Sequence, residues 1–347
     1  MMDRAQKAQP SRGEGRRKPS AAERRRRTQL GHRWLRYGIQ VAFFVLAPAV
    51  FSGAFSAVKY CFAQIAAGEP LEATAFVVLL LAVLGFTIVF GRFFCGYACA
   101  FGTLGDVLHD AFEFLRSKTP IPRIVFPAAL VKALSLLKYL VLAGICLACF
   151  TGTWGAYAGY SPWVAFAAIL SGSLDGVDTV AFALLAAVAV GMVVRERFFC
   201  QFLCPLGALF SLMPVLGFSE FTRTRGHCAR NCGKCHDACP VSIWPDADSL
   251  RHGECIECGR CADACPMANV NLVALERPAA RDKHASEQDA APHPLRKTRE
   301  GWLLFRGTHF AYTLVRAALL LGVLWAAGST RYLPPLADIL ALLPLPF

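Results

Sequence analysis

Residues 92–102 of the chain read RFFCGYACAFG, and residues 197–207 read RFFCQFLCPLG. Each stretch follows a long apolar run and places two cysteines four positions apart, with a glycine three residues after the second cysteine. A motif that is duplicated together with the apolar segment before it indicates an internal repeat. We therefore predict that the two copies face each other across a pseudo-twofold axis.

The apolar residues gather in segments that are long enough for membrane-spanning helices. The chain is 55% hydrophobic and 17% charged, whereas an average soluble protein has about 25% charged residues. A helix needs ~20 apolar residues to cross a bilayer. The five segments are residues 38–58, 72–94, 130–151, 177–194 and 307–328. We predict an α-helical integral membrane protein with about five transmembrane helices and a parallel internal repeat.

The positive charge of the chain predicts its topology. The net charge is +12, and residues 1–33 carry two arginine-rich runs with few acids. We predict a disordered basic tail that contacts membrane lipid and no nucleic acid. Lys and Arg also concentrate in residues 92–129 and 195–306, and cytoplasmic loops are enriched in them. We therefore expect a bacterial inner (cytoplasmic) membrane protein with the N-terminus inside and the C-terminus outside. Lys132 and Lys138 should snorkel to the headgroups.

The order of these features predicts five parts. They are a cytoplasmic tail at 1–33, a membrane domain at 34–216, a cysteine-rich insert at 217–275, a polar linker at 276–300, and a last transmembrane helix with an outer tail at 301–347. Two further apolar pieces, 158–172 and 333–347, are short or broken by proline. We expect them to be interfacial or re-entrant.

The insert holds two cysteine runs, each closed by proline. CIECGRCADACP at 255–266 has the spacing of bacterial ferredoxins, and CARNCGKCHDACP at 228–240 has one extra residue in its first gap. In two-cluster ferredoxins the fourth cysteine of each run binds the other cluster. Zinc sites use separated cysteine pairs, and disulfides are rare in the cytoplasm. We predict two [4Fe-4S] clusters. Cluster 1 is assigned to Cys228, Cys232, Cys235 and Cys265, and cluster 2 to Cys239, Cys255, Cys258 and Cys261.

The duplicated motif predicts a further redox or metal site. Its four cysteines are Cys95, Cys99, Cys200 and Cys204. Free cysteines are often only small apolar side chains, but duplication in register favours a function. The site could be a metal centre or an open dithiol site for Cu(I), which prefers soft ligands.

Other positions that the two copies of the repeat share predict how that site is built. Arg92 and Arg197 should flank the cysteines and favour thiolate over thiol. Gly102 and Gly207 should permit a reversal of the backbone, and the phenylalanine pairs should exclude water.

Further candidates carry weaker signals. Cys146 and Cys149 share one helix face and suggest a disulfide relay, a metal site or packing alone. Cys61 is a single outer cysteine. His109 and His309 lie near the predicted inner surface, where they would contact a quinone, a haem or lipid headgroups.

The combination resembles the membrane polyferredoxin family (NapH/NosR-like 4Fe-4S proteins with twin C-x3-C(P) motifs). The resemblance covers residues 34–275 and depends on the two motif pairs, on Pro205 and on the eight cysteines of the insert. Ala100 departs from the proline that is usual in the first motif. The resemblance implies electron transfer between a cytoplasmic or quinone donor and an extracytoplasmic acceptor, with any flavin on a partner.

The chain lacks an acid–base or nucleophile constellation, so substrate chemistry should belong to a partner. Our main hypothesis is an electron-transfer subunit of an oxidoreductase, such as a quinol dehydrogenase component, that serves an extracytoplasmic reductase or flavoprotein. One alternative is a copper-reducing, metal-handling assembly factor for a respiratory oxidase. Another is a membrane-anchored redox sensor.

Overall fold

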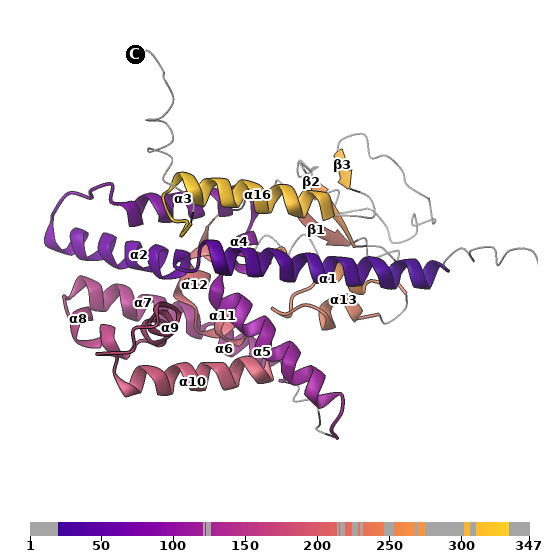
Figure 1. The fold of residues 1–347 in the computed structure, drawn as a ribbon, viewed down its shortest axis with the longest axis horizontal. Coiled ribbons are helices and arrows are strands. Elements are labelled where there is room, and N and C mark those ends of the chain that lie inside the picture. Colours follow the sequence, from indigo (N-terminus) through magenta and orange to yellow (C-terminus); the bar gives the residue numbers. More distant parts are fainter. Residues whose placement is uncertain are drawn as a thin grey trace, which may run out of the picture.

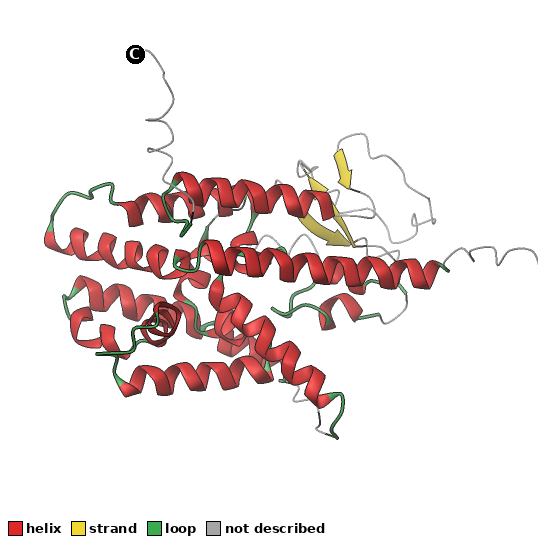
Figure 2. Cartoon of the chain, in the orientation of Figure 1, coloured by secondary structure: helices red, strands yellow, loops and turns green. Residues whose placement is uncertain are grey.

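The structure is a computed structural model. It describes residues 20–120, 122, 126–213, 215, 219–223, 228–229, 232–245, 253–267, 270–274, 302–305 and 310–332. Most of these residues are helical, and a small antiparallel sheet lies at one end of the helical bundle (Figures 1 and 2). The prediction of a mostly helical protein is confirmed.

The first two helices form one long, broken rod along the bundle (Figure 1). They are α1 (Ala21–Leu46) and α2 (Val50–Ala67). The break falls at Pro48, as expected because proline lacks the N–H that an uninterrupted helix needs. The predicted span at 38–58 is therefore the end of α1 and the first half of α2.

The predicted disordered tail is wrong for residues 21–33, because α1 begins at Ala21. Ser20 and Glu23 form a reciprocal capping box that satisfies the free N–H groups of the first turn. Along the helix, Arg33 pairs with Asp110 at 3.0 Å, and the His32 ring lies 2.5 Å from Asp263. His32 and Arg33 thus have partners elsewhere in the fold. Residues 1–19 lie outside the described part.

The internal repeat consists of three helices in each copy. The first copy is α3 (Ala75–Phe90), α4 (Phe93–Tyr97) and α5 (Ala100–Arg116). The second copy is α10 (Thr179–Val194), α11 (Phe198–Phe202) and α12 (Pro205–Leu212). The copies interlock, because α5 packs against α10 and α11.

The segment between the copies contains α6 (Ala128–Ser135), α7 (Leu137–Phe150), α8 (Trp154–Tyr157), the 3-10 helix η1 (Ala158–Tyr160) and α9 (Pro162–Ser171). Lys138 does not snorkel. Its side chain is fully buried, and its Nζ lies 2.5 Å from Oε1 of Glu254. A carboxylate from the insert neutralises this lysine inside the protein.

In the part of the chain that the structure describes, two helical segments are long and apolar enough to cross a membrane, namely Val50–Ala67 and Ala129–Phe150. Four further apolar helices are shorter, at Ala75–Phe90, Pro162–Ser171, Thr179–Val194 and Phe310–Ala326. Each of the five predicted spans overlaps one of these helices, although the span at 38–58 covers only the first half of Val50–Ala67. The sixth helix, Pro162–Ser171, falls in the segment predicted to be interfacial. Five complete crossings remain a prediction.

The sheet has the order β1-β2-β3, with both pairs antiparallel. β1 (Ser219–Arg223) and β2 (Val270–Ala274) pair side by side along their whole length, with Ser219 opposite Ala274. They bring together the two ends of the insert, which also contains α13 (Lys234–Asp237) and α15 (Arg260–Ala264).

The region assigned to the last span begins differently from the prediction. Residues Trp302–Phe305 form β3, which pairs with β2, and α16 covers only Phe310–Ala326. Arg316 of α16 is fully buried. The ten residues after it rise roughly 15 Å, about half of a ~30 Å hydrocarbon core. The linker at 276–300 and the outer tail at 333–347 lie outside the described residues.

Candidate functional site

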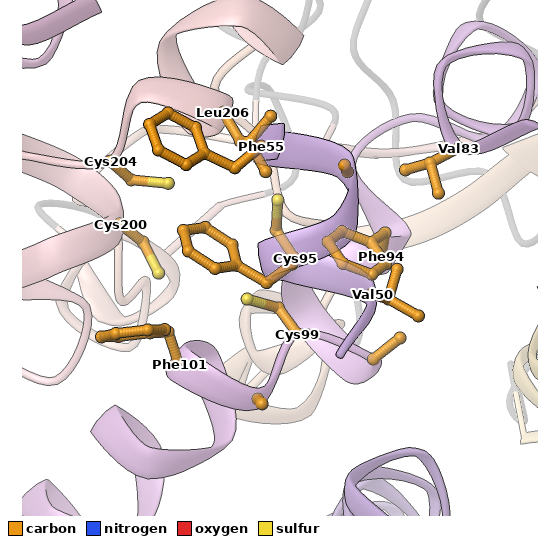
Figure 3. Close-up of a cluster of buried hydrophobic side chains, with 14 of the residues drawn as sticks. Val50, Phe55, Val83, Phe94, Cys95, Cys99, Phe101, Cys200, Cys204 and Leu206 are labelled. Atoms are coloured by element: carbon orange, nitrogen blue, oxygen red, sulfur yellow. The ribbon is translucent and has the colours of Figure 1, made fainter. Parts of the chain in front are cut away.

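The four cysteines of the repeat lie together at the centre of the bundle. In Figure 3, Cys95 and Cys99 of one motif face Cys200 and Cys204 of the other. Cys95 and Cys200 occupy equivalent places in α4 and α11, while Cys99 and Cys204 are the N-caps of α5 and α12. All four are buried and free of disulfides. We call this group the twin-cysteine site.

The surroundings of the twin-cysteine site suit sulfur ligands in a dry environment. Burial raises the pKa of the Cys99, Cys200 and Cys204 thiols, and the neighbouring thiols raise it further. Thiols in such a place lose their protons only when a positive group compensates the charge. The N–H of Gly207 donates to Sγ of Cys204 at 3.1 Å. A bound metal centre would supply the remaining compensation.

Arg197 reaches from the second motif into the first. Its Nη1 donates to the carbonyl of Cys95 at 2.6 Å, and its Nη2 pairs with Asp106 at 2.7 Å. The arginine is 1% exposed and Asp106 is 0% exposed. A Cβ at Gly102 would overlap the guanidinium. The glycine therefore makes room for the arginine of the other copy.

Arg92 makes the corresponding contact in the opposite direction. Its guanidinium lies 3.1 Å from the place that a Cβ at Gly207 would take. Its Nη1 also donates to the carbonyl of Gly253 at 3.2 Å and pairs with Glu254 at 3.2 Å. Arg92 and Arg197 thus each reach the glycine of the other motif, and their role beside thiolates stays a prediction. The predicted role of the glycines is wrong, because both lie inside helices without a positive φ.

Aromatic side chains close one side of the twin-cysteine site. Phe101 stacks on Phe199 with a centroid distance of 4.8 Å, and Phe51 and Phe166 contact Phe101 at 5.1 and 4.3 Å. Phe101 lies beside the cysteines in Figure 3. The predicted exclusion of water agrees with this arrangement, since Phe51, Phe101 and Phe199 are each at most 4% exposed.

The cysteines assigned to cluster 1 line one small cavity in the insert. This cavity is formed by Cys228, Cys232, Cys235 and Cys265, together with Arg223, Ala229, Pro266, Met267 and Val270. Arg223 donates to Sγ of Cys235 at 3.9 Å. The fourth cysteine of the second run thus joins three cysteines of the first run. Cys228 is among them despite the longer first gap.

The cysteines assigned to cluster 2 also form a group. Burial raises the pKa of Cys261 well above its usual value, and the neighbouring thiols of Cys258 and Cys239 raise it further. Burial also raises the pKa of Cys255 well above its usual value, and Glu257 and Cys261 raise it further. Burial and Cys258 raise the pKa of Cys239 to about 11. The fourth cysteine of the first run therefore lies with the second run.

The twin-cysteine site lies directly against the cluster 2 group. A Cβ at Gly96, next to Cys95, would overlap the carbonyl of Ile256, and Tyr97 donates to the carbonyl of Cys258 at 3.3 Å. From the second motif, Nε2 of Gln201 donates to the carbonyl of Val241 at 3.0 Å. Both motifs thus hold loops that carry cluster 2 cysteines. The twin-cysteine site and the cluster 2 group are neighbours. Cys235 and Cys265 belong to the cluster 1 group, farther into the insert.

A cavity of about 800 Å³ opens beside the cluster 2 group. Its wall includes Cys239 and Cys258, and also Arg36, Glu196 and His109. Glu196 is 7% exposed, pairs with Arg260 and lies 4.0 Å from Arg36. Burial raises the pKa of Glu196 to about 7 against the opposing effect of Arg260.

Several polar side chains around the candidate site escaped the sequence reasoning. They are Gln40, Asp106, Glu196, Glu254, Glu257 and Arg316. Their only local signal is a charged or polar residue inside or directly beside an apolar segment or a cysteine run. Such residues are rare near membrane helices and mark functional sites.

Among the weaker candidates, the three cysteines do not join these groups, whereas His109 lines the cavity beside cluster 2. Cys149 is buried and Cys146 half-buried on α7, and neither forms a disulfide. Cys61 is half-buried on α2. The Nδ1 of His109 lies 3.0 Å from the carbonyl of Val193, on the wall of the cavity. His309 lies outside the described residues.

Among the residues that the structure describes, no group of three or more His, Cys, Asp or Glu side chains could hold a single metal ion. A four-iron cluster differs, because its four thiolates bind four separate irons.

Comparison with known proteins identifies the repeat. A family described as "4Fe-4S binding domain" matches residues 72–122 and 177–217. These residues are the two copies of the repeat with the twin-cysteine site, and the match leaves out the cysteine runs of the insert. No solved structure matches the chain significantly.

Three relatives illustrate the similarity. Protein NirI of Paracoccus denitrificans is 31% identical over 47% of this chain and 23% of its own length. The regulatory protein NosR of Pseudomonas aeruginosa is 31% identical over 48% and 23%. The methylamine utilization ferredoxin-type protein MauN of Paracoccus denitrificans is 28% identical over 50% and 57%. The chain thus spans about a quarter of NirI and NosR.

Proposed function

Since the chain belongs to the NapH/NosR-like family of membrane polyferredoxins, we propose that it is the electron-transfer subunit of a membrane oxidoreductase. It takes electrons from a quinol and passes them to a reductase or flavoprotein on the extracytoplasmic side. The observation that carries the proposal is the contact of both repeat motifs with the loops of the cluster 2 group, at Ile256 and Val241.

Three ligand sets follow from this arrangement. Cluster 1 would be held by Cys228, Cys232, Cys235 and Cys265, cluster 2 by Cys239, Cys255, Cys258 and Cys261, and a third cluster by Cys95, Cys99, Cys200 and Cys204. N–H groups that donate to sulfur at Cys204, Cys235 and Cys255 fit thiolate ligands. Bound iron–sulfur clusters would supply one-electron transfer along this row.

The cavity beside cluster 2 is our choice for the quinol headgroup. Oxidation of a quinol to a quinone releases two electrons and two protons, so the site needs proton acceptors as well as a nearby cluster. This cavity offers Glu196 and His109 next to Cys239 and Cys258. A second cavity of about 850 Å³, between α2, α3 and α9, is lined mainly by apolar residues and contains no carboxylate or histidine. It suits an isoprenoid tail or lipid better than the oxidation step.

The alternative of a copper-reducing assembly factor makes a different demand on the thiols. Thiols that receive and release a substrate metal must be accessible, and Cys95, Cys99, Cys200 and Cys204 are each only 6–7% exposed. Their burial favours a resident centre. We retain the proposed topology, with the insert cytoplasmic and the C-terminus outside, as part of this function.

The test is anaerobic purification of the full chain in detergent, followed by iron and sulfide analysis and mixing with a short-chain quinol. We expect about twelve iron and twelve sulfide per chain, and reduction of the clusters by the quinol. The quadruple Cys-to-Ser variant of the twin-cysteine site should lose about four of each and keep the insert clusters.

Two results would reject the proposal. One is stoichiometric zinc or copper in place of iron. The other is full iron content with clusters that the quinol cannot reduce although dithionite can, which would point to a soluble donor.

A further inference from the structure

Helix α16 brings a buried cation to the cluster 2 loop. Arg316 is 0% exposed, and its Nη1 lies 3.2 Å from Oε2 of Glu257. The guanidinium lies between two rings, with its carbon 4.6 Å from the centroids of both Phe93 and Tyr312. Phe93 belongs to the first repeat motif, so the arginine contacts the insert and the membrane motif at once.

Glu257 occupies a special place in the insert. It stands between Cys255 and Cys258 and is 3% exposed. Its φ of 55° lies in the left-handed region, which is strained for a residue other than glycine. Its N–H donates to Sγ of Cys255 at 3.4 Å. A buried carboxylate beside thiolate ligands repels their charge, so this backbone and charge arrangement needs a compensating cation.

The charge of Arg316 is directed mainly at Glu257. Within the described part of the chain, Nε and Nη2 of Arg316 have no hydrogen-bond partner. Burying a guanidinium with so few hydrogen-bond partners destabilises the fold unless its ion pair offsets the desolvation. Charged residues within predicted membrane helices are rare and mark functional sites. The fifth apolar segment is therefore more than an anchor.

We propose that the charges of Arg316 and Glu257 act on cluster 2 in opposite directions and together set its reduction potential. This inference rests on the proposed assignment of Cys239, Cys255, Cys258 and Cys261 to that cluster. Reduction adds one negative charge to the cluster. A nearby cation favours the reduced form and an anion favours the oxidised form, so the pair Arg316–Glu257 holds the potential between the two limits.

The test is a potentiometric titration of the full chain, followed by electron paramagnetic resonance. The cluster 2 signal is the one that disappears in the Cys258→Ser variant. We expect Arg316→Met to lower its midpoint potential and Glu257→Gln to raise it. The double variant Arg316→Met/Glu257→Gln should return close to the parent value. Lys59→Met removes a half-buried cation of α2 that contacts Phe55 and Trp154, and it should leave the potential unchanged.

The outcomes separate this inference from the proposed function. If Arg316→Met loses iron, its midpoint potential cannot be compared with that of the parent. Arg316→Lys, which keeps the positive charge, then replaces it and should leave the potential close to the parent value. The direction of the shift in Glu257→Gln tests the inference independently. An unchanged midpoint potential in Glu257→Gln with full iron content would overturn the inference, and so would shifts of equal sign in both single variants. Absence of any iron–sulfur signal in the parent protein would instead refute the proposed function.

Discussion

Replacing Gly102 by alanine should destabilise the protein, although alanine is the better helix former. The added Cβ would overlap the guanidinium of Arg197 and also approach the carbonyl of Cys95 at 2.9 Å. Arg197 would have to withdraw from Asp106, with which it pairs at 2.7 Å in the interior.

The magnitude follows from two opposing contributions. A Gly-to-Ala change inside a helix stabilises by up to ~1 kcal/mol. Breaking a buried ion pair costs ~3–5 kcal/mol because a charge is left buried and unpaired. The net loss is ~2–4 kcal/mol, which lowers the ratio of folded to unfolded protein about 30- to 700-fold.

The assay is SDS-induced unfolding in detergent micelles, followed by tryptophan fluorescence. Gly85→Ala in α3 is the matched control, because a Cβ there meets nothing within 4 Å, and it should be neutral or stabilising. Gly207→Ala should lie between the two, since its Cβ would meet Arg92 at 3.1 Å and needs only a small shift. If Gly102→Ala were as stable as Gly85→Ala, the contact of Arg197 with the first motif would not stabilise the fold.

Four further outcomes are expected. The rate at which quinol reduces the clusters should increase as pH rises and reach half its maximum near pH 7. The reason is that burial raises the pKa of Glu196 to about 7 and only the ionised carboxylate accepts a proton. Glu196→Gln should flatten this pH profile, measured by stopped-flow absorbance. Gly96→Ala, whose Cβ would overlap the Ile256 carbonyl, should slow electron transfer between the insert and the twin-cysteine site at unchanged iron content, as freeze-quench spectroscopy would reveal. Lys138→Met should destabilise by ~1–3 kcal/mol, because it removes the closest cation of Glu254 while Arg92 stays paired with this carboxylate. A stability in the SDS assay equal to that of the parent protein would contradict this. Reporter fusions after residues 120 and 290 should report the cytoplasm and a fusion at 165 the outside, while a reversed pattern would overturn the charge argument.

The cysteine groups could be anticipated from the sequence because the spacing of ligands along the chain is itself the signal. The meeting of the two motifs could be anticipated from their duplication in the same way. The acidic partners of the motif arginines could not be anticipated. Asp106 is 91 residues from Arg197, and Glu254 is 162 residues from Arg92. Pairs at such separations depend on how the helices pack, and a single sequence does not encode them locally.

The errors have related physical causes. Lys138 was assigned to the headgroups because hydropathy describes only its own helix, whereas its partner arrives from the insert. The tail was predicted to be disordered from its charge, but its second half forms α1 because Ser20 and Glu23 cap the helix and Asp110 and Asp263 pair with its side chains. Strand β3 was missed because its pairing partner, β2, lies on the other side of a polar segment.

Neither copy of the duplicated motif is complete by itself, because the arginine of each copy fills the space beside the glycine of the other. A protein with a single copy would meet this need by association with a second molecule of itself. A C2 homodimer provides the required geometry, since the same patch on both subunits exchanges contacts reciprocally. Gene duplication followed by fusion would then preserve the subunit interface inside one polypeptide. Within one polypeptide the two halves can differ, and Gly96 meets one loop of the insert where the equivalent Gln201 meets another.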